Sequence, residues 1–158
     1  MNALIILAII FGVLFTLVFV TKRRFGMLGL ALTAGATLSG LWASDLTPYV
    51  QQAGLDLVAP PLETVISVVL ILLPAVALLF SSPKVHKLRQ KLISATLFAL
   101  LALGFMQESL GTALVLEGQG KVVFGYLTQY HGWIITVGIV YALFDLLFVK
   151  TPKIDKEH

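Results

Sequence analysis

The 158-residue sequence contains no cysteine and little charge, and both shortages exclude classes of protein. Without cysteine there is no disulfide framework and no cysteine nucleophile. Only 12% of the residues are charged while 58% are hydrophobic, whereas a soluble domain has about 25% charged and about 45–50% apolar residues. Such a chain cannot cover a surface in water with polar groups, and it is too hydrophobic to be disordered. The composition predicts an integral membrane protein.

The sequence also lacks the common motifs of enzymes and metal sites. It contains no H-E-x-x-H, G-x-S-x-G or P-loop pattern, each of which would place a catalytic group or a phosphate-binding loop. Its few histidines stand far apart, and no three or four metal ligands cluster in sequence. We therefore expect no metal, no cofactor and no enzymatic activity, although an intramembrane active site assembled from dispersed residues would leave no such motif.

Five hydrophobic stretches are long enough to cross a bilayer, whose hydrocarbon core of about 30 Å needs about 20 apolar residues in a helix. They cover residues 3–20, 25–43, 64–80, 92–106 and 132–149. The sequence thus predicts an all-α bundle of five transmembrane helices. We expect one domain over residues 1–150, followed by a short cytoplasmic tail over residues 151–158.

Basic residues gather on one side of these five crossings. That side carries Lys22, Arg23, Arg24, Lys84, Lys87, Arg89, Lys91, Lys150, Lys153 and Lys156, and the other carries Lys121 with Asp45, Asp56, Glu63, Glu108 and Glu117. Because excess positive charge stays in the cytoplasm, we predict an outside N-terminus and a cytoplasmic C-terminus. The net charge of +3 is explained by topology, so we expect no nucleic-acid partner.

The second stretch is rich in small residues, and we expect its helix to be central. Two pairs, Ala31 with Gly35 and Ala36 with Gly40, have the small-xxx-small spacing that lets helix backbones approach closely in lipid. These residues predict a helix-packing face. It serves either internal packing or a self-association face or cavity lining, for which hydroxyl groups are available at Thr33, Thr37 and Ser39.

An amphipathic pattern follows the second stretch. Apolar residues recur at helical intervals at Leu46, Tyr49, Val50, Ala53 and Leu57. Thr47-Pro48 is typical of a helix start, and Pro60-Pro61 ends the pattern. Residues 48–58 are too few to span a membrane, so we predict a helix that lies flat at the outer interface, or else dips in as a re-entrant element.

Two residues inside the stretches are chemically unusual. Pro74 removes a backbone donor and should kink the third helix, either as an ordinary feature of membrane helices or as a gating hinge. Asp145 is an acid within the fifth stretch, about one turn from Lys150. Intramembrane carboxylates are often functional, so Asp145 is either a solvated or Lys-paired residue near the cytoplasmic boundary or a polar site inside the bundle.

The order of features over residues 1–110 resembles the colicin V production protein (CvpA-like) family. An uncharged first helix is followed by Arg23-Arg24-Phe25-Gly26, which leads directly into the small-residue-rich helix, an outer amphipathic stretch and another hydrophobic pair. The fifth stretch lies beyond the resemblance. The resemblance implies a bacterial inner-membrane protein connected with toxin export or envelope homeostasis.

Two functions fit the sequence. The first is a small non-enzymatic transport, channel-type or export-related protein, homo-oligomeric because five short helices enclose little pathway of their own. The alternative is an accessory or structural subunit of a larger membrane complex. A row of polar residues along one helix face would favour transport, and the stretches contain only isolated polar positions. Expected partners are the lipid bilayer and either further copies of the chain or other membrane proteins.

Overall fold

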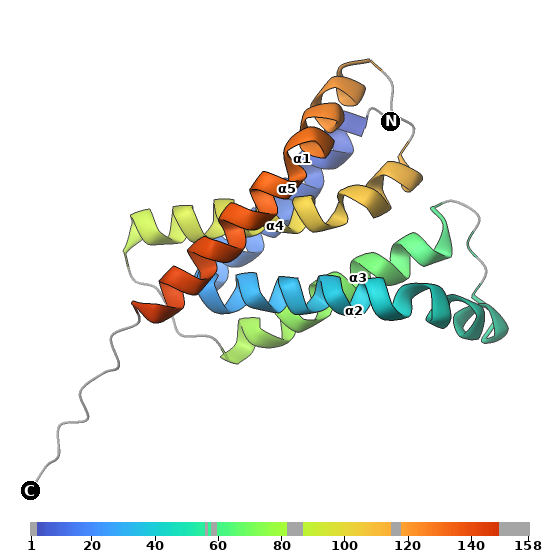
Figure 1. Ribbon diagram of the computed structural model, residues 1–158, viewed down its shortest axis with the longest axis horizontal. Coiled ribbons are helices and arrows are strands. Elements are labelled where there is room, and N and C mark those ends of the chain that lie inside the picture. The colour runs from blue at the N-terminus through green and yellow to red at the C-terminus, as the bar shows by residue number, and fades with distance from the viewer. Residues whose placement is uncertain (1–2, 56, 58–59, 82–86, 115–117, 149–158) are drawn as a thin grey trace, which may run out of the picture.

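The computed structural model describes residues 3–55, 57, 60–81, 87–114 and 118–148. This part of the chain forms five α-helices (Figure 1), which are α1 (Ala3–Thr21), α2 (Phe25–Gln52), α3 (Leu62–Ser81), α4 (Leu88–Ala113) and α5 (Gly118–Leu147). All five are long and apolar enough to cross a membrane. The prediction of an all-α chain with five helices of spanning length is confirmed.

Consecutive helices run in opposite directions, so the bundle has two chemically different ends (Figure 1). One end, called the basic end below, holds the α1–α2 turn and the start of α4, with Lys22, Arg23, Arg24, Lys87, Arg89 and Lys91. The opposite end, called the acidic end below, holds the end of α2, the start of α3 and the end of α4, with Asp45, Glu63 and Glu108. The predicted topology determinant Lys84 and the predicted tail, 151–158, lie outside the described residues.

The centre of the bundle is shared by α2 and α4. Helix α4 contacts all four other helices, and α2 packs along α3 over the most extensive interface while also touching α4 and α5. In α4, 50% of the spanning residues are buried, against 11% in α5, so α5 is peripheral. The largest fully buried side chains are Phe25, Phe98, Leu28, Leu32, Leu101, Met106 and Val18. The second helix is central, as expected, and α4 shares that position.

The amphipathic segment is not a separate helix. Residues 48–52 form the last part of α2, which continues to Gln52. The Thr47 hydroxyl donates to the Ala43 carbonyl (2.8 Å) one turn earlier in the same helix, so Thr47 does not cap a second helix. Helix α2 ends where Gly54 adopts φ +92°, a left-handed conformation that glycine tolerates best. Its N–H donates to Gln51 (2.9 Å), as is typical of a helix C-terminus. The predicted interfacial helix over 48–58 is therefore wrong, and Asp56 and Val58 lie outside the described residues.

Helices α4 and α5 also extend past the predicted spans. Helix α4 covers residues 88–113 where 92–106 was predicted, and α5 begins at Gly118, well before the predicted start at Gly132. Helical hydrogen bonds join backbone groups four residues apart and do not depend on the hydropathy of the side chains, so a helix can continue after its apolar stretch ends. At about 1.5 Å per residue, the 30 residues of α5 span about 45 Å, which exceeds the hydrocarbon core of about 30 Å.

Candidate functional site

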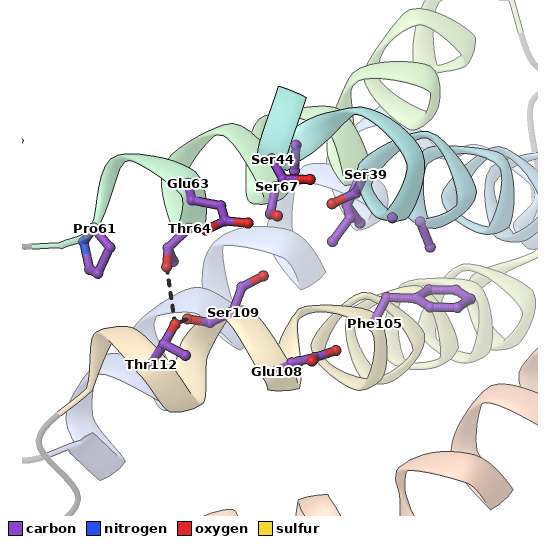
Figure 2. A pocket seen from close by; sticks show the side chains of 14 residues that line it. Ser39, Ser44, Pro61, Glu63, Thr64, Ser67, Phe105, Glu108, Ser109 and Thr112 are labelled. Carbon is purple, nitrogen blue, oxygen red and sulfur yellow. Dashed lines mark hydrogen bonds between the residues drawn. The ribbon is translucent and has the colours of Figure 1, made fainter. Parts of the chain in front are cut away.

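A polar cleft of ≈ 550 Å³ lies between α2, α3 and α4 near the acidic end (Figure 2). Its volume falls in the range of small-molecule sites, about 300–1,000 Å³. Six hydroxyl side chains line it: Ser39 and Ser44 from α2, Thr64 and Ser67 from α3, and Ser109 and Thr112 from α4. The carboxylates of Glu63 and Glu108 complete its polar lining, and small or apolar residues supply the rest. We call this space the polar cleft.

Helical spacing explains why dispersed residues meet in the polar cleft. Thr64 and Ser67 are three residues apart on α3, as are Ser109 and Thr112 on α4, and residues three apart share a helix face. Small residues on α2 continue the same wall, with Ala36, Ser39, Gly40 and Ala43 at intervals of three or four. Three helices thus turn small or hydroxyl-bearing faces towards one space.

One pair of hydroxyls joins two walls of the polar cleft. The Oγ1 atoms of Thr64 and Thr112 are 3.1 Å apart, and Thr112 donates its own proton to the Ser109 carbonyl at 2.8 Å. Because Thr112 has one hydroxyl proton, Thr64 is the donor in the bond between the two threonines. This bond ties α3 to α4.

Ser39 is the most buried serine that lines the polar cleft. The residue is 8% exposed, and within the described part of the chain its hydroxyl makes no hydrogen bond. Figure 2 shows the Ser39 and Ser109 hydroxyls pointing from opposite walls into the polar cleft. By contrast, Thr33 and Thr37 on the same helix donate to carbonyls of their own helix at 3.0 Å. The Ser39 Oγ is not among the fully buried polar atoms that lack a partner, so it borders the open space of the polar cleft, where it can bond to a molecule that enters.

The electrostatics of the polar cleft favour positive charge. Glu63 and Glu108 are its charged lining residues, and no Lys, Arg or His lines it among the described residues. Neither carboxylate takes part in an ion pair or hydrogen bond within the described part of the chain. No group of three or more His, Cys, Asp or Glu residues in the described ranges could hold a metal ion. The arrangement suits a monovalent guest better than a multidentate metal.

Towards the middle of the bundle the polar cleft meets the hydrophobic core. Ile71 and Phe105 line this inner part. Close by, Gly35 of α2 lies directly on the backbone of α3, where a Cβ atom would clash most closely with the Ile71 carbonyl oxygen and sit 2.8 Å from the Leu70 carbonyl oxygen. Pro74 has no N–H, so it cannot donate the helical bond that Leu70 would otherwise accept from it. The predicted packing residue Gly35 thus lies beside Leu70, whose carbonyl receives no helical hydrogen bond from the predicted kink residue Pro74.

The other predicted packing residues have different surroundings. Ala31 is 5% exposed, so it is packed inside the bundle. Ala36 and Gly40 line the polar cleft, and a Cβ on Gly40 would meet nothing within 4 Å. The small-residue pattern on α2 thus serves close packing at Gly35 and an open wall at Gly40.

Asp145 lies at the basic end, where it joins α5 to α2. Its Oδ2 accepts the Gly26 N–H at 2.9 Å, and its Oδ1 lies 3.9 Å from an Arg24 guanidinium nitrogen. Arg24 is the N-cap residue of α2 and makes no side-chain capping bond. A carboxylate at this position satisfies an amide of the first turn and opposes the positive end of the helix dipole. Lys150, its predicted partner, lies outside the described residues, and Asp145 does not line the polar cleft.

Arg23 makes the corresponding contact of a cation at a helix C-terminus, the end of α3. Its guanidinium Nη2 donates to the Phe80 carbonyl at 3.3 Å, and a cation at a helix C-terminus is favourable. The tight α1–α2 turn that carries it contains Lys22 at φ 56°. The basic residues predicted to set topology thus include two, Arg23 and Arg24, that also connect helix ends.

Sequence reasoning missed the polar cleft, and a signal was present. Ser39 was considered as a cavity-lining hydroxyl, but the spacing of Thr64 with Ser67 and of Ser109 with Thr112 was not recognised as two polar faces. Both pairs flank the predicted apolar stretches or lie at their edges, where polar residues are ordinary.

No family model, curated protein or solved structure matches this chain.

Proposed function

We propose that this chain is a non-enzymatic membrane transport protein that admits a small polar solute into the polar cleft. The observation that carries the proposal is the polar cleft itself, ≈ 550 Å³ between three helices of spanning length. Ser39, which is 8% exposed, lines it with a hydroxyl that has no partner in the described part of the chain. Bilayer hydrocarbon disfavours unsatisfied polar groups, so intramembrane polar residues mark solute pathways.

The positive-inside rule gives the proposal its direction. The basic end faces the cytoplasm if its Lys and Arg residues follow this rule, and the polar cleft then opens on the outer side. The resemblance to the colicin V production protein family supports a bacterial inner membrane as the location. The protein would receive its solute from outside the cytoplasm.

The apolar inner part of the polar cleft favours a carrier over an open pore. Ile71 of the hydrophobic core and Phe105, which packs against that core, line its inner part, and the Gly35 contact holds α2 against α3 beside them. Passage to the basic end requires α2 and α3 to separate there. Pro74 lies four residues after Leu70, which lies at this contact, so a bend of α3 at Pro74 would open the inner side.

The accessory-subunit alternative accounts for less of the molecule. A subunit needs apolar outer faces, which α1 and α5 provide with exposed residues such as Val13 and Val137, but lipid covers such faces equally well. It does not require a hydroxyl-lined cleft with a partnerless buried serine. Homo-oligomerisation is compatible with either function and would use the peripheral helices, because Gly35 is occupied by α3.

The absence of cysteine permits a direct test of access to the polar cleft. A Ser39→Cys variant contains a single thiol, which can be challenged with a membrane-impermeant methanethiosulfonate reagent in right-side-out and inverted vesicles. A carrier exposes the polar cleft alternately, so we expect S39C to react in both vesicle orientations. The measured quantity is the modification rate in each.

Ser94→Cys is the matched control, because Ser94 is 7% exposed but does not line the polar cleft. It should stay unreactive from the side on which S39C reacts fastest. Reaction of S39C from one side alone would overturn transport and leave a static binding cleft. Absence of reaction from both sides would overturn the solute-accessible cleft altogether and favour the subunit function.

A further inference from the structure

We propose that the solute of the polar cleft is a small organic cation, with an ammonium or guanidinium head and a short hydrocarbon portion. This inference rests on the proposed function and adds the chemical class of the ligand. Three observations lead to it: the charge of the polar cleft, the uneven distribution of its polar and apolar walls, and the partnerless Ser39 hydroxyl.

Charge is the first observation. Two carboxylates, Glu63 and Glu108, face the polar cleft from α3 and α4, and no basic side chain lines it among the described residues. Asp45 adds a third acid near the end of α2, outside the polar cleft. A mouth lined by one sign of charge concentrates ions of the opposite sign. An anionic solute would meet uncompensated repulsion here.

The polar groups suit a donor-rich head. Ammonium and guanidinium groups carry several N–H donors and no acceptor, whereas carboxylates accept only and hydroxyls can accept. Figure 2 shows the Glu63 carboxylate on the same side of the polar cleft as the Ser67 and Ser39 hydroxyls. This group of three residues offers acceptors from α2 and α3 to one cationic head. Hydrogen bonds between charged partners are about twice as strong as neutral ones.

The inner wall is apolar and accounts for the hydrocarbon portion. Ile71, Phe105 and Ala36 line the polar cleft on its inner side with no polar side-chain atom. A bare inorganic ion would leave most of ≈ 550 Å³ to water. An organic cation instead places its alkyl part against Ile71 and Phe105, and an aromatic face also attracts a nearby cation.

The same features argue against a divalent metal as the guest. Ca²⁺ takes six to eight oxygen ligands and Mg²⁺ requires near-octahedral geometry. In the described ranges no three His, Cys, Asp or Glu side chains converge in that way. Neutral polyols could use the hydroxyls but would gain nothing from the negative charge of the two carboxylates.

The test compares two probes of the same shape, isobutylammonium and isobutanol, which differ in one charged group. Binding is measured by calorimetry on the full chain in lipid nanodiscs. We expect isobutylammonium to bind at least about tenfold more tightly than isobutanol. Glu63→Gln should weaken isobutylammonium binding by about tenfold, because it removes a charge-assisted contact with the cationic head. Glu108→Gln should weaken it as well, because it removes the second negative charge of the polar cleft.

Asp45→Asn is the matched control, since Asp45 carries an equal charge at the same end but does not line the polar cleft. It should change isobutylammonium affinity by less than about threefold, because a solvated charge outside the polar cleft adds only screened, long-range attraction. An equal effect of D45N and E63Q would overturn a specific cation site, leaving nonspecific attraction only. Ser39→Ala should weaken binding about threefold to tenfold through the loss of one acceptor.

Further probes separate failure of this inference from failure of the proposed function. Binding of erythritol but not isobutylammonium would overturn the cation and leave a polyol transporter. Binding of Mg²⁺ alone would make the polar cleft a metal site. If S39C reacts in both vesicle orientations while no cation binds, the inference fails and transport survives. If S39C reacts in neither, both fail.

Discussion

Charged side chains at the two ends of the bundle differ in whether they bond to other parts of the fold. At the basic end, Asp145 accepts the Gly26 amide and Arg23 donates to the Phe80 carbonyl, so charged side chains complete neighbouring helices. At the acidic end, Glu63 and Glu108 have no such partner within the described part of the chain. One end uses charge to hold the fold, and the other leaves charge available to a guest.

This contrast separates stability from binding. A polar group whose bonds are all internal stabilises the fold, so its loss lowers the free energy of unfolding. A polar group that faces an open cleft contributes little to folding, so its loss changes ligand affinity instead. Substitutions at the two ends should therefore produce different phenotypes.

The largest effect is expected between the two ends, at Gly35. A Gly35→Ala variant places a Cβ 2.8 Å from the Leu70 carbonyl, which forces α2 away from α3. We expect a loss of about 2–3 kcal/mol in the free energy of unfolding, measured by denaturation in detergent. Gly40→Ala is the matched control, because its Cβ would meet nothing within 4 Å. It should be neutral or slightly stabilising, since alanine favours helix over glycine. Equal stability of both variants would refute the close contact.

The next largest loss of stability is expected at the basic end. Asp145→Ala removes the acceptor of the Gly26 amide and the charge beside Arg24. We expect a loss of about 1–2 kcal/mol, the usual value of a helix cap. Asp145→Asn should lose less because its amide oxygen still accepts. Asp45→Asn at the other end should stay within about 0.5 kcal/mol, and an equal loss there would remove the contrast between the two ends.

A smaller effect on stability is expected at the acidic end, where the hydroxyls of Thr64 and Thr112 bond to each other. Thr64→Val and Thr112→Val, alone and together, form a double-mutant cycle on the 3.1 Å contact between their hydroxyls. We expect a coupling energy of about 0.5–1 kcal/mol in unfolding experiments. A coupling near zero would mean that the pair does not tie α3 to α4.

The smallest effect on stability is expected in Glu63→Gln and Glu108→Gln. Both side chains are exposed and make no bond within the described part of the chain. Their unfolding free energies should match that of the native chain within about 0.5 kcal/mol, even though we expect cation binding to fall. A clear loss of stability in either variant would show that the acidic end also uses its charges to hold the fold.

The number and kind of helices followed from composition, whereas their ends did not. Hydropathy measures the stretch that lipid can cover, and it identified all five helices. It cannot locate the terminus of a helix that continues into water, as α2 does to Gln52 and α5 does from Gly118. Gly54 carried the missing information for α2, because its positive φ ends the helix.

The polar cleft and the Asp145 contact were harder to predict for a different physical reason. Both depend on which helix faces turn towards one another, and that is decided by packing between distant segments. Gly35 was recognised as a close-packing residue from its spacing, but its partner on α3 was not evident. Asp145 was recognised as unusual, but its acceptor role needed the position of Gly26.

The bond between Gly26 and Asp145 joins residues 119 positions apart, and this separation bears on how the chain is made. Because α2 is synthesised before α5, the Gly26 amide has no Asp145 acceptor until α5 has also been made. The first turn of the second helix is completed by the last helix to emerge. If synthesis stopped before residue 145, the first turn of α2 would lack the acceptor of its Gly26 amide. That turn would be completed only when α5 packs against α2.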